Sequence, residues 1–266
     1  MANLGGITKK DVIVFYCQLM MGAQFGRVKN AQSQEDIVIA CLRMGWNDAF
    51  KHVTKNVKVE DAGKKEKDWP SQLELSEKKW RQDRAHSEAY DDFICGNILE
   101  KKGKIFRTFM DYACAEDTDK KVKIITDNLG DLKKQLKDYK ETLGDKQLCF
   151  GHFQKMFNMA IKTYACLYLC RDELQLGDSL FYDDIINNIK NADCPIDSII
   201  LEKLSGDTRG NYTAQKWSKY GVDKKHPVDD YKNVQSAISK INEGKGKCNL
   251  YYDFIAWKRD NKDNDD

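Results

Sequence analysis

The sequence predicts an all-α protein with little or no β-sheet. Apolar residues recur at the spacing of one helical face through most of the chain. The three prolines, Pro70, Pro195 and Pro227, each precede such a pattern, as expected of a residue that the first turn of a helix tolerates. No run of strict polar and apolar alternation is bounded by Asn-Gly or Asp-Gly turns. Strands are therefore expected to be minor at most.

Helical periodicity defines the expected elements in chain order. In the first half it predicts helices at 12–20, 37–44, 80–99, 105–110 and 122–125. In the second half it predicts a charged helix at 131–143, followed by helices at 155–170, 180–189, 199–204 and 234–241. The segment 155–170 is apolar on almost every face, which is the pattern of a buried central helix.

Breaks in this periodicity predict the division of the chain. The lysine-rich stretch 52–73, the point near 128–130 and the stretch 206–227 interrupt the helical pattern, and the charged tail 258–266 is expected to fray. We expect two lobes from these breaks, an N-terminal helical lobe at 1–130 and a second lobe at 131–266.

Composition restricts the class of protein. The 266 residues are long enough for one large helical domain or two lobes, and their mixture of 41% hydrophobic and 32% charged residues is typical of a soluble globular chain. No stretch approaches the roughly 20 apolar residues of a membrane helix. The first residues lack the basic and apolar regions of a secretory signal, so we expect a cytoplasmic protein. The net charge of +2 gives little support to a strongly basic nucleic-acid binder.

The nine cysteines are odd in number, scattered and mostly flanked by apolar residues. This usage predicts buried free thiols in a reducing compartment rather than a disulfide framework. Cys166 and Cys170 share a helical face, but no histidine accompanies them at the spacing of zinc ligands. We therefore expect neither a metal site nor a cofactor.

Lys155 is a candidate nucleophile. After Leu148-Cys-Phe150 we expect a glycine turn at Gly151, which leads into the apolar helix with Lys155 in its first turn. Apolar neighbours and the positive end of the helix dipole both disfavour the ammonium, and a lowered pKa would produce a reactive amine. The alternative is a lysine that extends its ammonium to water and only covers the helix end.

Asp197 is the candidate partner of this lysine. In the segment Cys194-Pro-Ile-Asp-Ser198 it falls in or just before the first turn of the helix that follows Pro195. A carboxylate held at a helix N-terminus is well placed to stabilise a developing positive charge or to take a proton. Asp197 as an ordinary N-cap is the structural alternative, and the two roles are compatible.

Together these motifs resemble those of the helix-hairpin-helix DNA glycosylases, and most of all the archaeal-type and related bacterial 8-oxoguanine glycosylase-like branch. In that superfamily a glycine hairpin leads into a helix with a catalytic lysine, and a Val/Ile-Asp-Ser/Thr segment carries a catalytic aspartate. Gly151, Lys155 and Asn158 match the first motif, and Ile196-Asp197-Ser198 matches the second. Phe153 replaces the usual second glycine of the hairpin.

The resemblance covers roughly residues 140–205 and implies a two-lobed helical fold with DNA as the partner. A damaged or modified base would be flipped into a pocket between the lobes. Lys155 would then attack the sugar C1′ carbon and expel the base, leaving a Schiff base from which an AP lyase step can cut the strand. Asp197 would stabilise the positively charged sugar and transfer a proton.

Residues near the two motifs are candidates for contacts with DNA. The hairpin glycine would allow a phosphate to approach the backbone, neighbouring polar residues would contact the base or a phosphate, and tryptophans would form the pocket wall. Helix capping and core packing are the structural alternatives. The candidates are Gly151, His152, Gln154, Asn158, Lys216, Trp217 and Lys219, with Trp257 as a second wall residue.

Two other functions remain open. Arg81 and His86 lie close together in a predicted helix and resemble the Arg and His pair of HEPN-type ribonucleases, in which they cleave RNA without a metal. A solvent-facing charged helix is the structural alternative. The third hypothesis is a non-catalytic helical module that binds nucleic acid or a protein.

Overall fold

The computed structural model of the protein describes residues 4–12, 24–50, 95–96, 99–137 and 148–258. Within these ranges all regular secondary structure is helical and no strand is present, which confirms the all-α prediction. Most of the expected helices at 12–20 and 80–99, and the end of the one at 131–143, lie outside the described residues.

Besides short helical stretches at 9–12 and 95–96, ten α-helices and four 3₁₀ turns make up the regular secondary structure of the described residues. The α-helices are α2 (Gln24–Lys29), α3 (Gln34–Phe50), α6 (Lys104–Ala113), α7 (Thr118–Lys137), α9 (Phe150–Leu169), α10 (Arg171–Leu174), α11 (Asp183–Asn188), α12 (Ser198–Thr208), α13 (Val228–Asn242) and α14 (Asn249–Lys258). The 3₁₀ turns are η3 (Asp178–Leu180), η4 (Ile189–Asn191), η5 (Trp217–Lys219) and η6 (Glu243–Lys245). The expected helix at 180–189 is split among η3, α11 and η4.

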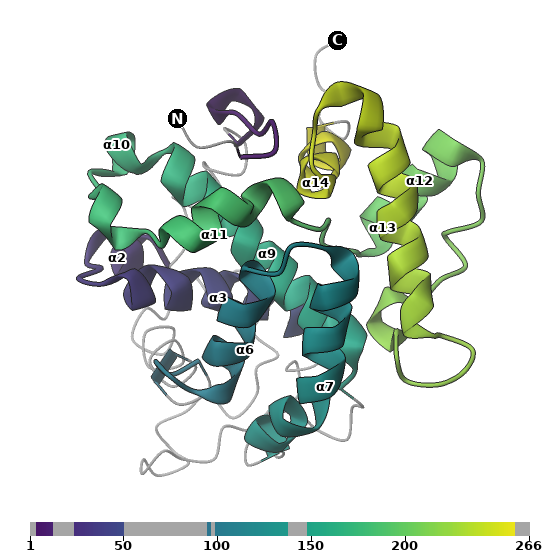
Figure 1. Cartoon of the computed structure of the whole chain (residues 1–266), viewed down its shortest axis with the longest axis horizontal. Helices are drawn as coiled ribbons and strands as arrows, with labels where there is room; N and C mark the ends of the chain where they lie inside the picture. Colours follow the sequence, from purple (N-terminus) through teal and green to yellow (C-terminus); the bar gives the residue numbers. More distant parts are fainter. Residues whose placement is uncertain (1–3, 13–23, 51–94, 97–98, 138–147, 259–266) are drawn as a thin grey trace, which may run out of the picture.

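Helix α9 lies in the middle of the molecule, as its apolar pattern on almost every face predicts. Nearly every one of its residues is buried, from Phe150 to Leu167 with the exception of Met159. Helices α3, α6 and α7 pack against it, and α12 and α13 lie together at the right of Figure 1. The N-terminal and C-terminal parts of the chain therefore share one hydrophobic core around α9.

The prediction of a glycine turn at Gly151 is wrong. Helix α9 begins at Phe150, with extended Cys149 as its N-cap, so Gly151 lies inside the first helical turn. The glycine is needed there for another reason, because a Cβ atom at Gly151 would lie only 1.9 Å from the carbonyl oxygen of Trp217. Gly151 therefore allows the backbone of turn η5 to contact the start of α9.

The expected break near 128–130 is also absent. Helix α7 runs without interruption from Thr118 to Lys137, so the predicted lobe boundary at 130 and 131 falls inside a helix. Gly130 is exposed there, and a glycine in a helix interior costs only about 1 kcal/mol. Burial of Leu132 and Leu136 on the inner face of α7 offsets a cost of this size.

Gly45 brings α3 unusually close to α9. A Cβ atom at Gly45 would lie 2.1 Å from the carbonyl oxygen of Met156, and both groups belong to helix backbones that cannot easily move apart. Asp48 follows Gly45 by three residues and therefore lies on the same face of α3. The close approach of the two helices places the side chain of Asp48 beside α9.

Substitution of Gly45 by alanine is expected to lower the free energy of unfolding by about 1–3 kcal/mol, because the added methyl group overpacks the contact between α3 and α9. Gly130→Ala is the matched control, since it adds the same methyl group to a helix where nothing lies within 4 Å. That control should stabilise the protein by about 0.5–1 kcal/mol. Urea unfolding followed by circular dichroism measures both. A Gly45→Ala variant as stable as Gly130→Ala would contradict the close contact.

The described cysteines are free, and all of them except exposed Cys114 are buried, as predicted from their apolar neighbours. Burial raises the pKa of the Cys41, Cys166 and Cys194 thiols, which keeps them protonated at neutral pH. No helix in the described part of the chain is both long enough and apolar enough to cross a membrane.

Candidate functional site

Lys155 and Asp197 meet in the structure. The Nζ atom of Lys155 lies 3.4 Å from Oδ2 of Asp197 and 3.0 Å from Oδ2 of Asp48. The lysine side chain is only 8% exposed, so it does not extend to water as the structural alternative supposed. A buried ammonium between two carboxylates is the centre of the candidate site. Two of its three members were singled out from the sequence, and Asp48 was not.

Trp217 covers the same lysine. Its ring centroid lies 4.8 Å from Nζ of Lys155, within the range of a cation–π contact. Trp217 begins turn η5, and the close approach that Gly151 permits brings this turn onto the start of α9. The indole is partly buried, so it forms part of the surface next to the ion cluster.

The charge state of Lys155 differs from the expectation. Burial lowers its pKa, but the carboxylates of Asp48 and Asp197 together raise it by more, and the net pKa lies above the usual 10.5. The expected lowering is therefore wrong for the protein without a substrate. Burial and the helix dipole, which lower the pKa, are evident in the sequence, but the contact with Asp48, which raises the pKa, is not. Lys155 is an ammonium at neutral pH.

Asp197 has the backbone position that its sequence context predicts. It is the N-cap of α12, with extended backbone geometry, and its Oδ1 atom accepts a hydrogen bond from the backbone N–H of Ile200 at 3.0 Å. This bond satisfies one of the free N–H groups at the helix start and fixes the carboxylate. The other oxygen, Oδ2, is directed to Lys155. The capping role and the contact with Lys155 therefore occur together.

Gln154 links the two motifs directly. Its side-chain amide donates to the carbonyl oxygen of Ile196 at 3.1 Å and accepts from the backbone N–H of the same residue at 3.3 Å. Gln154 is the neighbour of Lys155, and Ile196 is the neighbour of Asp197. One fully buried side chain therefore sets the separation between the start of α9 and the segment that ends at the catalytic candidate Asp197.

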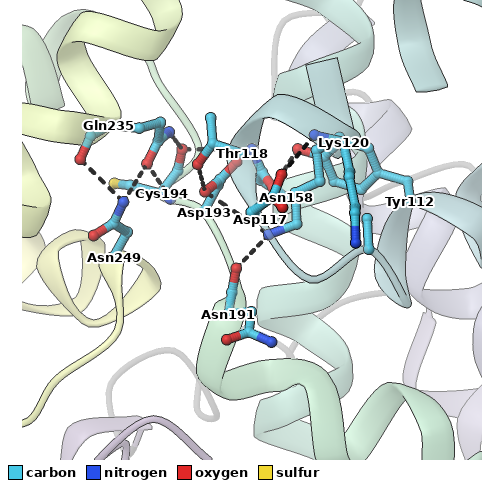
Figure 2. A network of polar contacts seen from close by, with 12 residues as sticks. Tyr112, Asp117, Thr118, Lys120, Asn158, Asn191, Asp193, Cys194, Gln235 and Asn249 are labelled. Carbon is cyan, nitrogen blue, oxygen red and sulfur yellow. Dashed lines mark hydrogen bonds and ion pairs between the residues drawn. The ribbon is translucent and has the colours of Figure 1, made fainter. Parts of the chain in front are cut away.

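A second group of buried hydrogen bonds, one turn further along α9, fixes the start of the segment from Asp193 to Asp197. Oδ1 of Asn158 accepts from the hydroxyl of Tyr112 at 2.8 Å, and its amide nitrogen donates to the hydroxyl of Tyr231 at 3.0 Å. The Tyr231 hydroxyl donates in turn to Oδ2 of Asp193 at 2.9 Å. Figure 2 shows Asn158 and Asp193 in this network. Helices α6, α9 and α13 thereby hold the start of the segment.

Gln235 of α13 and Thr118 of α7 also hold this segment (Figure 2). The Gln235 side chain accepts from the backbone N–H of Cys194 at 3.0 Å and donates to its carbonyl oxygen at 2.7 Å. The Thr118 hydroxyl donates to Oδ1 of Asp193 at 2.7 Å. The segment from Asp193 to Asp197 contains no helix, yet its backbone is fixed by side chains from α9 and α13. Such a rigid support limits the positions that the Asp197 carboxylate can adopt.

Most of the predicted DNA contacts near Lys155 lie in the interior. Gln154 and Asn158 have no exposed surface, and Gly151 is covered by turn η5. His152 is buried as well, with its ring stacked on Phe50 at 5.7 Å and its Nδ1 atom accepting from the N–H of Cys149 at 3.4 Å. These residues hold the fold together, and a direct contact with DNA would require the helices to separate.

The later loop has the opposite character. Lys216 and Lys219 are exposed on either side of the partly buried Trp217, and their contact with DNA stays a prediction. The side chain of Trp257 and the proposed ribonuclease pair Arg81 and His86 lie outside the described residues.

Two charged groups on other helices were missed in the sequence. Asp48 contacts Lys155 from α3, and Asp253 of α14 forms an ion pair with Lys162, two turns along α9 from Lys155. Both carboxylates are remote in sequence from the lysines that they contact. A glycine and an aspartate three residues apart in an apolar helix were the only local signal for Asp48, and this pattern is not specific.

Comparisons of the chain with protein families, with curated proteins and with solved structures found no match. Functional inference therefore rests on the geometry around Lys155. In the described part of the chain, no three His, Cys, Asp or Glu side chains are grouped so that they could hold a metal ion.

Proposed function

We propose that the protein is a DNA glycosylase that removes a damaged or modified base, with Lys155 as the nucleophile and Asp197 as its carboxylate partner. The observation that carries this proposal is the 3.4 Å distance between Nζ of Lys155 and Oδ2 of Asp197. The two residues come from the starts of different helices and could have pointed to opposite faces. Their convergence is what the resemblance to helix-hairpin-helix glycosylases requires, and a two-lobed fold of that type is part of the proposal.

A basic loop that contains Trp217 supports DNA as the partner. The loop from Arg209 to His226 carries exposed lysines on both sides of Trp217, while Asp223 is its only carboxylate. Cations on an exposed loop bind phosphates without base specificity. The exposed basic residues of this loop are Arg209, Lys216, Lys219, Lys224 and Lys225. The loop would hold the DNA backbone while Trp217 lies against the reactive lysine.

The proposed reaction begins with loss of a proton from the ammonium of Lys155. The neutral amine attacks C1′, forming a C–N bond while the bond between C1′ and the base breaks. The base leaves with the electron pair of that bond and takes up the second proton that Nζ releases. The nitrogen lone pair then forms a C=N bond while the bond between C1′ and the ring oxygen breaks, and the ring oxygen takes a proton from water, which leaves a protonated Schiff base. Asp197 stabilises the positive charge that develops on the sugar during this step.

Access to Lys155 requires a movement of its cover. The lysine side chain is 8% exposed, and the ring of Trp217 lies against Nζ. A flipped nucleotide would therefore reach the amine only after this ring moves. Turn η5 is the part of the site that would rearrange, because it joins α12 and α13 through a long loop rather than belonging to the central helices.

Borohydride trapping on DNA tests the proposal. The full chain is incubated with duplexes that carry single oxidised, alkylated or deaminated bases or an abasic site, and borohydride reduces any Schiff base to a stable crosslink. We expect a crosslink with at least one duplex. Lys155→Ala should abolish it, and the control Lys240→Ala, which removes an exposed lysine of α13, should leave it unchanged.

The outcomes separate the proposed function from its alternatives. Absence of any crosslink with the wild-type chain, together with absence of free base release, overturns the glycosylase proposal. Salt-sensitive DNA binding without either reaction would favour the binding module. RNA cleavage that disappears in His86→Ala would favour the ribonuclease.

A further inference from the structure

Asp48 lies at the candidate site although it belongs to neither glycosylase motif. It comes from α3, and its Oδ2 atom is 3.0 Å from Nζ of Lys155, closer than the carboxylate of Asp197. Gly45 permits the close approach of α3 to α9 that this contact requires. The contact is therefore built into the packing of two core helices.

The two carboxylates differ in their surroundings. Asp197 is 13% exposed, and the backbone N–H of Ile200 donates to its Oδ1 atom at the start of α12, where the helix stabilises its negative charge. The side chain of Asp48 is 41% exposed. It therefore borders both the buried ammonium and water, so a proton received from Lys155 can leave to solvent.

We propose that Asp48 is the catalytic base of Lys155. This inference rests on the proposed glycosylase function and assigns its first proton transfer. One N–H bond of the ammonium breaks, an O–H bond forms on the Asp48 carboxylate, and the lysine becomes a neutral amine. Asp48 then returns its proton to water after the base has left. Asp197 keeps its charge throughout and stabilises the sugar cation.

A purely electrostatic role for Asp48 predicts the opposite effect of its removal. The Asp48 carboxylate raises the pKa of Lys155, so its loss increases the fraction of neutral amine at a given pH. If Asp48 did nothing else, an Asp48→Asn variant would react as fast as the wild type or faster. A folded variant that is slower at neutral pH and recovers as the pH rises is what participation of the carboxylate in the proton transfer predicts. The direction of the rate change therefore decides between the two roles.

The experiment measures the single-turnover rate of crosslink formation on the duplex that the wild-type chain attacks best. At neutral pH we expect Asp48→Asn to lower this rate by about 100-fold, as loss of a general base does. Asp48→Glu, which keeps the carboxylate, should recover part of the rate. Asp111→Asn, an exposed aspartate of α6, is the matched control and should react like the wild type.

The pH profile gives a readout that a structural defect would not produce. In Asp48→Asn, hydroxide or water must remove the proton, so the rate should rise about tenfold per pH unit until Lys155 is neutral. The wild-type rate should change much less over the same range. Thermal unfolding of both chains verifies that Asp48→Asn is folded at each pH.

Each outcome has a defined meaning. A slow Asp48→Asn variant that recovers at high pH supports Asp48 as the base. An Asp48→Asn variant that crosslinks at the wild-type rate or faster overturns this role while the glycosylase function stands. A wild-type chain that forms no crosslink overturns both proposals.

Discussion

Substitution of Asp253 by asparagine is expected to lower the free energy of unfolding by about 3–5 kcal/mol. Asp253 and Lys162 form an ion pair in the core, and their side chains are 2% and 3% exposed. Removal of one partner leaves the other charge in a medium that solvates it poorly, although the Lys162 ammonium still lies 4.9 Å from the ring centroid of Phe254. Urea unfolding at neutral pH measures the loss.

A double variant separates the cost of a buried charge from the value of the pair. Lys162→Met combined with Asp253→Leu removes both charges and keeps apolar volume, so it should be far more stable than Asp253→Asn alone. Asp127→Asn is the control, because Asp127 pairs with Lys123 on the exposed face of α7 and its loss should have little effect. If Asp253→Asn were as stable as the wild type, the ion pair would have to be in contact with water, which would contradict its buried position.

Much of the fold was predictable because helical periodicity reports burial directly. The segment from Lys155 to Cys170 is apolar on almost every face, and it forms most of the buried central helix α9. The incorrect predictions of secondary structure were made at glycines. Gly130 was interpreted as a break and Gly151 as a turn, yet both lie inside helices. A glycine in a helix indicates either tolerated exposure, as at Gly130, or a close backbone contact, as at Gly151, and only the tertiary structure distinguishes them.

The candidate site was predictable only where local rules apply. Asp197 was placed by its position at a helix start, and its N-cap geometry follows from that rule. Asp48 was missed because it reaches Lys155 through the packing of α3 on α9, which leaves no pattern near either residue. The same omission reversed the predicted direction of the Lys155 pKa shift, since the sign depends on whether carboxylates compensate for burial.

The polar residues of α9 show a second limit of prediction from the sequence. Gln154 and Asn158 stand next to the proposed nucleophile and were interpreted as DNA contacts. In the structure they support the backbone between Cys194 and Ile196. Polar side chains on a helix that is otherwise buried must find partners in the interior, and such a helix indicates a hydrogen-bond network at least as strongly as a ligand site.

The free energy of unfolding is expected to fall steeply above pH 10, because Tyr112 and Tyr231 are buried in the network that holds the Asp193 segment. Burial raises the pKa of each phenol well above its ordinary value of 10.0. Both hydroxyls ionise near that value in the unfolded chain but stay protonated in the folded one. The stability that these two phenols contribute is therefore complete below pH 10 and is lost as the pH rises toward the pKa of the folded state, at about 1.4 kcal/mol per pH unit for each tyrosine.

The Tyr112→Phe variant isolates one of these contributions. Loss of the hydrogen bond to Asn158 lowers stability by a similar amount at every pH, so it shifts the stability curve downward without changing its slope. Loss of the ionisable phenol removes about 1.4 kcal/mol per pH unit from the slope above pH 10. Urea unfolding at a series of pH values from neutral to alkaline measures both quantities. An unchanged slope would mean that the Tyr112 hydroxyl ionises equally well in the folded protein, which is incompatible with a closed network around Asp193.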